Sequence, residues 1–304
     1  MRLIYLFVVL FFCLSPEATV AVKIEKALLY TGYQLQDRYA YGDKTREFQW
    51  QKISDGLDSA LAFQRHNIWM GILVNYKNVN GVPPLAKEAR KNRYKGMDDA
   101  WGTSQYQGIP FYKTTDITVP ERYGRDGMLV ALVNDSAGYF KIRTAFFKGD
   151  WWVPHRYVRP LGLNVFTKAV FVDRKNQNAV TLEYADTAWL VRSMVPVTTG
   201  VQKPPYMWRT PAGIFVVQGK IPKMFFNKDG SREPGGYAPY AARFSNGAYL
   251  HGVPVNYPDK NVIEYSATLG TFPRSHMCVR NVTSHAEFVY DWATVDGTLV
   301  FVFD

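Results

Sequence analysis

The first part of the chain contains one clear helical repeat of apolar residues, followed by a continuous apolar run. The residues of the repeat are Trp50, Ile53, Leu57 and Leu61. A spacing of three to four residues places these side chains on one face of a helix. The run at 67–76 predicts a buried strand, and the Lys- and Arg-rich stretch at 85–93 predicts a solvated helix. Residues 22–110 are therefore expected to form a mixed α/β region.

Residues 111–162 have a different pattern, in which short apolar runs alternate with turn residues. The runs lie at 128–133, 139–147 and 151–153. About five short strands within about fifty residues predict a small barrel. The residues WVP at 152–154, followed by YV at 157–158, resemble the end of the bacterial SH3-like modules that are often fused to cell-wall enzymes. The resemblance implies an SH3-like β module over 111–162.

The remaining residues, 167–304, consist of apolar or alternating runs with Gly, Pro and Asn turns between them. The predicted strands lie at 169–172, 179–184, 187–195, 213–217, 248–251 and 298–303. One helix is expected at 284–292, where Phe288 and Trp292 are four residues apart and share a face. His285 is expected on the exposed side of this helix. The pattern predicts a mainly β fold class for the chain.

The amino terminus has the features of a secretory signal peptide. Arg2 precedes an unbroken apolar run at 3–14, and the small-residue pattern at 19–21 offers a cleavage site. This run is shorter than the roughly 20 residues that a membrane-spanning helix needs, although an uncleaved amino-terminal anchor is an alternative. We therefore interpret residues 1–21 as a signal peptide and expect an exported protein, in the periplasm or the cell-wall space.

Charge adds a class of partner to this interpretation. The chain has 304 residues and is 47% hydrophobic, as globular proteins are, but it carries a net charge of +10. Outside the cytoplasm, such a charge favours anionic wall or envelope polymers as partners. The basic residues are scattered and form no nucleic-acid-binding motif, so we expect no nucleic-acid partner. The sequence indicates no metal and no cofactor, and we expect a monomer.

Removal of the signal peptide leaves a single cysteine, Cys278. It has no partner for an internal disulfide, and unpaired thiols outside the cytosol tend to oxidise or cross-link. The remaining interpretations are a buried inert thiol, an intermolecular bridge or a nucleophile. His276, Arg280 and the upstream pair His251-Gly252 favour a nucleophile, because a thiol needs a base or a cationic neighbour to ionise at neutral pH.

Several short motifs around this cysteine carry a family resemblance. The central one is the pair His251-Gly252, a spacer, and the run SHMCVR at 275–280. The flanking motifs are TG at 199–200, TPAGIF at 210–215, YAPY with RF at 237–244, and GTLV at 297–300. In this order they resemble the L,D-transpeptidase catalytic domain, the YkuD-like family of peptidoglycan cross-linking enzymes. The resemblance covers roughly 168–303 and implies a β-rich catalytic domain over 167–304.

The resemblance implies catalytic roles for the central motif. Cys278 would be the nucleophile and His251 its general base, with the Gly252 carbonyl holding the imidazole tautomer. The backbone N–H groups around Met277 and Cys278 would form an oxyanion hole. The implied substrates are peptidoglycan stem peptides. Attack falls on the carbonyl of the third residue of a stem tetrapeptide, the fourth residue leaves, and the acyl group passes to an amine on a neighbouring stem.

Further residues of the motifs are implied to surround the reacting atoms. His276 and Ser275 would line the site and orient their neighbours. Arg280 would bind a substrate carboxylate or brace the loop. Tyr240 and Tyr249 are interpreted as core or cleft-wall aromatics next to the substrate rather than as catalytic acids.

The chain departs from the family pattern in two places. Met277 stands where the family has glycine, so a positive φ at this position would strain the turn and reshape the oxyanion hole. We expect the turn to accommodate the side chain. The spacer from His251 to Ser275 is longer than is usual in the family, which predicts an enlarged loop near the mouth of the site.

Other functions fit parts of the same pattern. Sortases also order His, Cys and Arg, but with a longer gap between His and Cys, and papain-like and NlpC-type peptidases place Cys before His. Within the same fold, a carboxypeptidase or a cross-link or anchor hydrolase needs only water in place of the acceptor amine. A catalytically silent wall-binding protein is the non-enzymatic alternative, for which Met277 is the strongest indication.

Overall fold

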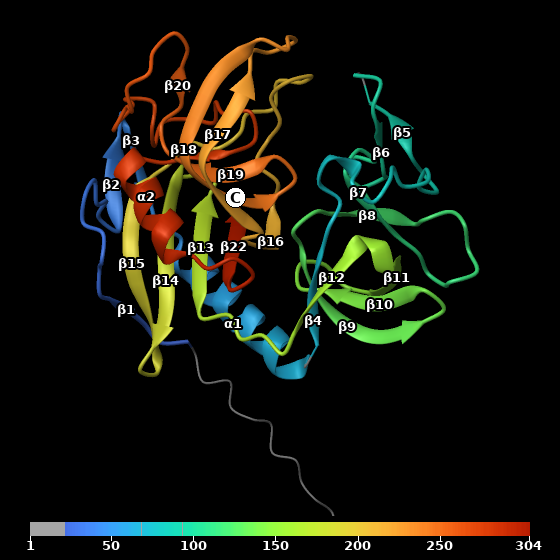
Figure 1. Cartoon of the computed structure of the whole chain (residues 1–304). Coiled ribbons are helices and arrows are strands. Elements are labelled where there is room, and N and C mark those ends of the chain that lie inside the picture. Colours follow the sequence, from blue (N-terminus) through green and yellow to red (C-terminus); the bar gives the residue numbers. More distant parts are fainter. Residues whose placement is uncertain (1–21, 68, 93) are drawn as a thin grey trace, which may run out of the picture.

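The computed structural model describes residues 22–304 except 68 and 93, and these residues form two lobes (Figure 1). The predicted signal peptide at 1–21 lies outside the described residues. Within the part of the chain that is described, no helix has the length and apolar character needed to cross a membrane.

A six-stranded sheet forms the centre of the larger lobe, with the order β1-β15-β14-β13-β22-β16. Its strands are β1 (Ile24–Lys26), β13 (Lys168–Asp173), β14 (Asn178–Ala185), β15 (Ala188–Pro196), β16 (Gly213–Val216) and β22 (Thr298–Phe303). All but β1 were predicted from their apolar runs. The prediction of a mainly β fold is confirmed.

The central strands are apolar on both faces because both faces of the sheet are covered. On β13, Phe171 faces one core and Val170 faces the other. The parallel register with β22 repeats this alternation, pairing Phe171 with Phe301 and Val170 with Val300. The Phe171 and Phe301 rings stack with their centroids 4.1 Å apart. A continuous apolar run therefore marks a strand buried between two layers.

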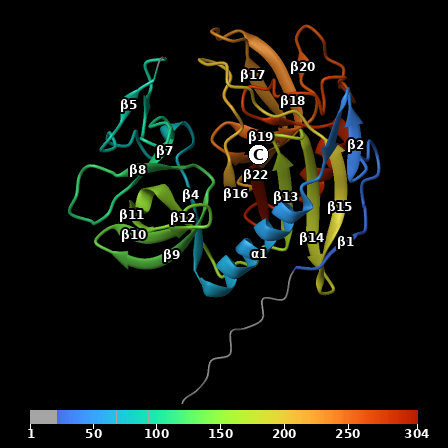
Figure 2. The same ribbon diagram turned by 180° about the vertical axis from the view of Figure 1, so that it is seen from behind.

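Helix α1 (Trp50–His66) covers the first face of the sheet, as Figure 2 shows. Its inward side chains are Ile53, Leu57 and Ala60, and they pack into the same core as Phe171. The helix was predicted from its repeat. A short hairpin, β2 (Arg38–Tyr41) and β3 (Lys44–Glu47), precedes it.

A second sheet and helix α2 (Thr283–Trp292) cover the opposite face. The strands of this sheet are β17 (Gly219–Asn227), β18 (Pro234–Ser245), β19 (Ala248–His251) and β21 (Val279–Arg280), with β20 (Val255–Asn256) paired to β18. The long hairpin formed by β17 and β18 was not predicted. Pro222 and Pro239 interrupt its sequence, and the residues of β17 are half-buried or exposed, so no apolar run marks it.

The smaller lobe contains a five-stranded sheet with the order β11-β10-β9-β4-β12. Its strands are β4 (Met70–Leu73), β9 (Leu129–Ser136), β10 (Tyr139–Thr144), β11 (Asp150–Pro154) and β12 (Val158–Gly162). Its other elements are the 3-10 turns η1 (Tyr76–Asn78) and η2 (His155–Tyr157) and the pairs β5 (Arg90–Lys91) with β6 (Met97–Asp98) and β7 (Gly108–Phe111) with β8 (Arg122–Arg125).

Strand pairing divides the chain differently from the sequence prediction. Residues 24–66 pack on the sheet of the larger lobe, and β4 belongs to the sheet of the smaller lobe, so 22–110 is not a separate region. The smaller lobe thus includes residues well before 111, and its SH3-like character stays a prediction. The helix predicted at 85–93 is wrong: the described part of this stretch holds a turn and the short strand β5. Lys87, Arg90 and Lys91 are exposed, but Lys87 lies in the turn and the two others form β5.

A buried carboxylate holds the two lobes together. Asp126 of the smaller lobe is 1% exposed and pairs with Arg243 of the long hairpin at 2.7 Å. It also accepts hydrogen bonds from the backbone N–H groups of Asn75 and Asn246, at 2.9 Å each, and from the side chain of Gln218. A buried charge is stabilised in this way only when it is fully hydrogen-bonded, so the interface has one preferred geometry.

The packing of α1 gives a first testable prediction. Leu57→Ala leaves a cavity between α1 and Phe171, so we expect the free energy of unfolding of the larger lobe to fall by about 2–5 kcal/mol. Urea denaturation followed by circular dichroism measures this, with the exposed Ser59→Ala as control. Loss of less than about 1 kcal/mol would show that α1 is not part of the larger lobe's core.

Candidate active site

A cleft of about 1050 Å³ opens between the long hairpin, strand β19 and the loop at 252–274. Cys278 and His251 both line it, as do Ser275, His276 and Arg280. Ile263, Tyr265 and Thr268 contribute to its wall, so the long spacer between His251 and Ser275 does form part of the mouth. Among the predicted site residues, the cleft brings together His251 and Arg280, which are 29 positions apart in the sequence.

Parallel pairing of β19 with β21 places the cysteine. Leu250 pairs with Val279 and His251 with Arg280, so Cys278 comes just before the start of β21, next to Tyr249. The thiol is 8% exposed, and its Sγ lies 3.4 Å from the carbonyl oxygen of Gly247. Burial raises the pKa of the Cys278 thiol to about 11, against the smaller lowering effects of the Tyr249 backbone and the Arg280 charge.

His251 has a fixed tautomer. Its Nδ1 lies 2.6 Å from the carbonyl oxygen of Gly252, and since a carbonyl can only accept, Nδ1 carries the hydrogen. The other ring nitrogen, Nε2, is then the proton acceptor. Burial lowers the pKa of His251 to about 4, so the ring is neutral at neutral pH. Only glycine fits at 252, because a Cβ there would lie 2.8 Å from Thr283 Oγ1 and 2.9 Å from Pro239.

In the turn at 275–278, two carbonyl groups accept hydrogen bonds from residues on the same side of the turn. The His276 carbonyl accepts from the Trp208 N–H at 2.7 Å, and the Met277 carbonyl accepts from Thr210 Oγ1 at 2.7 Å. In a trans peptide the N–H of the next residue points the opposite way. We infer that the N–H groups of Met277 and Cys278 point away from the Thr210 segment, on the side where Cys278 meets the cleft.

Met277 fits this turn without left-handed backbone. It is absent from the non-glycine residues of the described chain that have a positive φ. Its side chain lines a different cavity, on the Thr210 side of the turn. The close approach that requires glycine occurs instead at Gly200, where a Cβ would lie 2.8 Å from Met277 Cα and 2.3 Å from the Trp208 carbonyl oxygen. Backbone strain at Met277 is therefore no reason to expect a catalytically inactive site.

Ser275 and His276 have different positions on the cleft wall. Ser275 is 1% exposed, and its hydroxyl donates to the Cys278 carbonyl, which braces the turn from inside. His276 is exposed, and its Nε2 lies 2.8 Å from an oxygen of Asp229, at the tip of the long hairpin. The His276 imidazole thus links the turn to the hairpin at the rim.

Two arginines bring positive charge to the cleft. Arg280 and Arg274 both line it, and both have a buried Nε without a hydrogen-bond partner in the described residues. Burial lowers the pKa of Arg280, and the Cys278 thiol partly offsets this because a thiolate favours the charged guanidinium. Guanidinium groups in such a position suit a carboxylate ligand. Arg274 was not identified from the sequence, because it lies outside the motifs.

Tyr249 and Tyr240, the two tyrosines predicted to form a wall of the cleft, have different positions relative to it. Tyr249 lines the cleft, and burial together with the neighbouring Tyr76 hydroxyl raises the pKa of Tyr249. Tyr240 does not line the cleft: its ring contacts Tyr290 of α2 and its hydroxyl bonds Glu287. Its side chain therefore faces the helix, and its role in substrate binding stays a prediction.

The smaller lobe contributes to the cleft through Tyr76 and Lys77. Arg243 lies 4.6 Å from the centre of the Tyr76 ring, and the Tyr76 backbone N–H is bound by Asp126 at 3.1 Å. The interlobe carboxylate therefore also positions a wall of the cleft. No sequence signal points to Tyr76, because the contact depends on how the lobes pack.

His285 is a further correction. It is 1% exposed instead of lying on the helix surface. Its Nδ1 donates to Asn281 Oδ1 at 3.0 Å, and its Nε2 lies 2.8 Å from Ser193 Oγ. Burial lowers the pKa of His285 to about 3. The apolar spacing of Val282, Ala286 and Val289 around it could have placed it on the inner face.

The described residues contain no group of three or more His, Cys, Asp or Glu side chains that could hold a metal ion.

Residues 167–302 match the family model of the L,D-transpeptidase catalytic domain, YkuD. No curated protein sequence matches the chain.

Among solved structures, the chain is similar to an L,D-transpeptidase from Stackebrandtia nassauensis, with 23% identity, a TM-score of 0.33, and coverage of 45% of this chain and 56% of that one. It is similar to L,D-transpeptidase 3 from Mycobacterium tuberculosis, with 18% identity, a TM-score of 0.36, and coverage of 57% and 79%. It is also similar to a fused Zn-dependent amidase/peptidase/peptidoglycan-binding domain protein from Clostridium acetobutylicum, with 19% identity, a TM-score of 0.33, and coverage of 45% and 52%. The chain thus spans about half the length of the first and third of these.

The raised pKa of the thiol gives a prediction for its reactivity. Below the pKa of about 11 the thiol is protonated, so alkylation of Cys278 by iodoacetamide at pH 7 should be at least about tenfold slower than that of an exposed peptide cysteine. The rate should rise with pH toward a midpoint well above 9. Mass spectrometry measures the rate, with Cys278→Ala to correct for Cys13. A midpoint below 8 would indicate a resting thiolate–imidazolium pair instead.

Proposed function

Because residues 167–302 belong to the L,D-transpeptidase catalytic-domain family, we propose that this protein is a cysteine-dependent peptidoglycan L,D-transpeptidase. The observation that carries the proposal is the arrangement of His251 in the cleft of Cys278. The ring donates from Nδ1 to the Gly252 carbonyl and keeps Nε2 free to take a proton. A base oriented by a third group beside a nucleophile is the arrangement that covalent catalysis needs.

The first step is attack by Cys278 on the carbonyl of the third residue of a stem tetrapeptide. With the thiol pKa near 11 and the His251 pKa near 4, both groups are neutral before reaction. The imidazole therefore accepts the thiol proton as the sulfur–carbon bond forms, instead of holding a preformed thiolate. The N–H groups of Met277 and Cys278 stabilise the oxyanion of the tetrahedral intermediate.

The intermediate then collapses to a thioester. The carbon–nitrogen bond to the fourth residue breaks, and the protonated His251 gives its proton to the leaving amine. The amine of a neighbouring stem attacks the thioester, loses a proton to His251, and releases the Cys278 thiol with a new peptide bond. Water in place of this amine would make the same cleft a carboxypeptidase or hydrolase.

Charge supports the choice of substrate. Stem peptides carry carboxylates, and Arg280 and Arg274 present guanidinium groups to the cleft. The wall of Ile263, Tyr265 and Tyr249 gives the peptide backbone an apolar surface to lie against. We propose an exported protein that acts on the cell wall, with its net charge of +10 favouring anionic wall polymers.

Covalent reaction at Cys278 is tested with a carbapenem, a β-lactam that acylates the thiolate of this family. Wild type should gain one drug mass, and Cys278→Ala should gain none. His251→Ala should slow acylation by about 10²-fold or more, because the general base is lost. His276→Ala is the matched control and should stay within a few-fold, since His276 pairs with Asp229 at the rim. An adduct in Cys278→Ala, or full speed in His251→Ala, would contradict the assignment.

Met277 gives a separate test of whether the site is active. Because its backbone needs no positive φ, Met277→Gly should change the acylation rate by less than about tenfold. Removal of one oxyanion-hole donor costs about 3–4 kcal/mol, so a distorted hole would be evident. A gain of a hundredfold or more in the glycine variant, measured by stopped-flow or mass spectrometry, would favour the silent wall-binding protein.

A further inference from the structure

A second cavity lies on the opposite side of the catalytic turn, between the two lobes. We call it the interlobe cavity; it has a volume of about 700 Å³. The smaller lobe lines it with residues from 92–107, 122–128 and 146–147, and the larger lobe lines it with Arg174, residues from 202–212, Asn246 and Met277. The turn at 275–278 separates it from the cleft of Cys278: Met277 lines the interlobe cavity, and Ser275, His276 and Cys278 line the cleft.

Two guanidinium groups in the interlobe cavity lack an acceptor. Arg122 and Arg125 of β8 line it; the Arg122 Nε is buried without a hydrogen-bond partner, and the Arg125 side chain makes no hydrogen bond or ion pair with another described residue. Burial lowers the pKa of both groups, and the Asp99 carboxylate partly offsets this effect. Asp98 also lines the cavity, but the Asn92 amide binds it at 3.2 Å. A buried guanidinium nitrogen without an acceptor is costly unless a ligand supplies one.

Aromatic rings surround these charges. Arg122 lies 4.5 Å from the centre of the Trp101 ring and 3.8 Å from that of Phe147. Trp101, Tyr106 and Phe146 also line the cavity, and each is at least half exposed. Exposed rings give flat apolar surfaces on which the C–H faces of a sugar pack, and a guanidinium fork matches a carboxylate or a phosphate.

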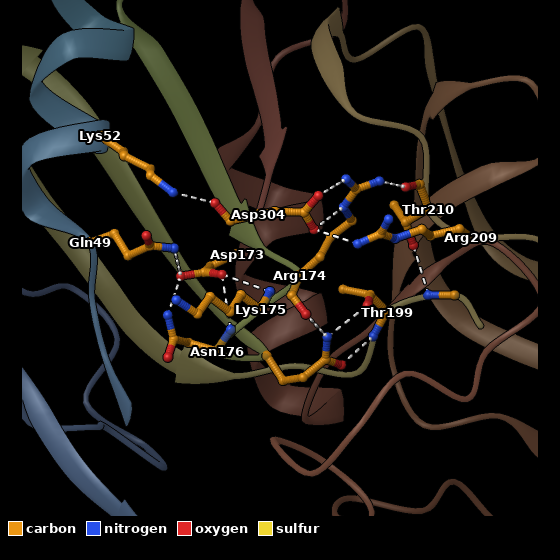
Figure 3. Close-up of polar contacts among 12 residues, drawn as sticks. Gln49, Lys52, Asp173, Arg174, Lys175, Asn176, Thr199, Arg209, Thr210 and Asp304 are labelled. Atoms are coloured by element: carbon orange, nitrogen blue, oxygen red, sulfur yellow. Dashed lines mark hydrogen bonds and ion pairs between the residues drawn. The ribbon is translucent and has the colours of Figure 1, made fainter. Parts of the chain in front are cut away.

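The floor of the cavity is joined to the catalytic turn. Arg174 pairs with Asp304 and donates to the Thr210 carbonyl at 2.7 Å, as Figure 3 shows. Arg209 pairs with the same carboxylate at 2.6 Å. The Thr210 hydroxyl in turn holds the Met277 carbonyl. These two arginines are thus committed to structure, which leaves Arg122 and Arg125 for a ligand.

We propose that the interlobe cavity binds an anionic saccharide, a sugar segment that carries a carboxylate or a phosphate. Arg125 and Arg122 bind its anionic group, and Trp101 packs on its sugar ring. The proposal rests on the proposed function in one respect, since an enzyme that acts on the cell wall meets such polymers. It adds to that function a site that holds the polymer beside the reacting stem peptide while the cleft stays free.

The experiment is isothermal titration of the whole protein with four probes. They are oligogalacturonate, glucose 1-phosphate, an N-acetylglucosamine tetramer and an oligoglutamate peptide. We expect one of the two anionic sugars to bind, and the neutral tetramer and the peptide to bind at least about tenfold more weakly. Preference for oligogalacturonate assigns a carboxylated glycan as the source, and preference for glucose 1-phosphate assigns a phosphate polymer.

Variants connect binding to the cavity. Arg125→Gln should weaken binding of the anionic sugar at least about tenfold, and Arg156→Gln, which removes the same charge from an exposed position, should not. Trp101→Ala, at the exposed rim, tests the sugar contact should Arg125→Gln fail to fold. Carbapenem acylation of Cys278 should be unchanged in these variants. Normal acylation with no sugar binding, equal binding of the peptide, or unchanged binding in both cavity variants would overturn the inference and leave the proposed function standing.

Discussion

One buried hydroxyl, that of Thr210, fixes the turn at 275–278, which contains the proposed nucleophile. It is 0% exposed, accepts a hydrogen bond from the Gly200 N–H at 2.7 Å and donates to the Met277 carbonyl at 2.7 Å. Three chain segments that are distant in the sequence therefore meet at one atom. Because the Met277 carbonyl is held on this side, the next N–H points toward the cleft. The position of the proposed oxyanion hole depends on this contact, and so does the separation of the cleft from the interlobe cavity.

Burial decides how the proposed chemistry proceeds. His251 and Cys278 are both shielded from water, which lowers the pKa of the imidazole and raises that of the thiol. Neither group is charged until a substrate carbonyl arrives, and a protonated thiol is less prone to oxidation because the thiolate is the reactive form. The smaller lobe takes part in this shielding, since Asp126 holds Tyr76 against the wall of the same cleft.

Much of the larger lobe could be predicted from the sequence, because strands buried on both faces give unbroken apolar runs. That His251 and Cys278 lie in one cleft could be expected, because the motifs at 251–252 and 275–280 are local and resemble one family pattern. The long hairpin could not be predicted, because Pro222 and Pro239 interrupt the sequence pattern of its two strands. The pairing of these strands depends on long-range contacts. Tyr240, Tyr76 and Arg274 depend on which way a side chain faces after packing, and no residue spacing encodes that. The boundary between the lobes could not be predicted either, because β1 and α1 join a sheet formed by residues more than 100 positions away.

The central claim is that Cys278 transfers a peptidyl group from one stem to another. The most direct measurement is incubation of the protein with defined tetrapeptide muropeptides, followed by mass spectrometry of the products. We predict dimers formed with the loss of one terminal residue from the donor stem, and none of these dimers with Cys278→Ala. Dimers that persist in Cys278→Ala would contradict the nucleophile, and shortened monomers without any dimer would contradict transfer and indicate a hydrolase.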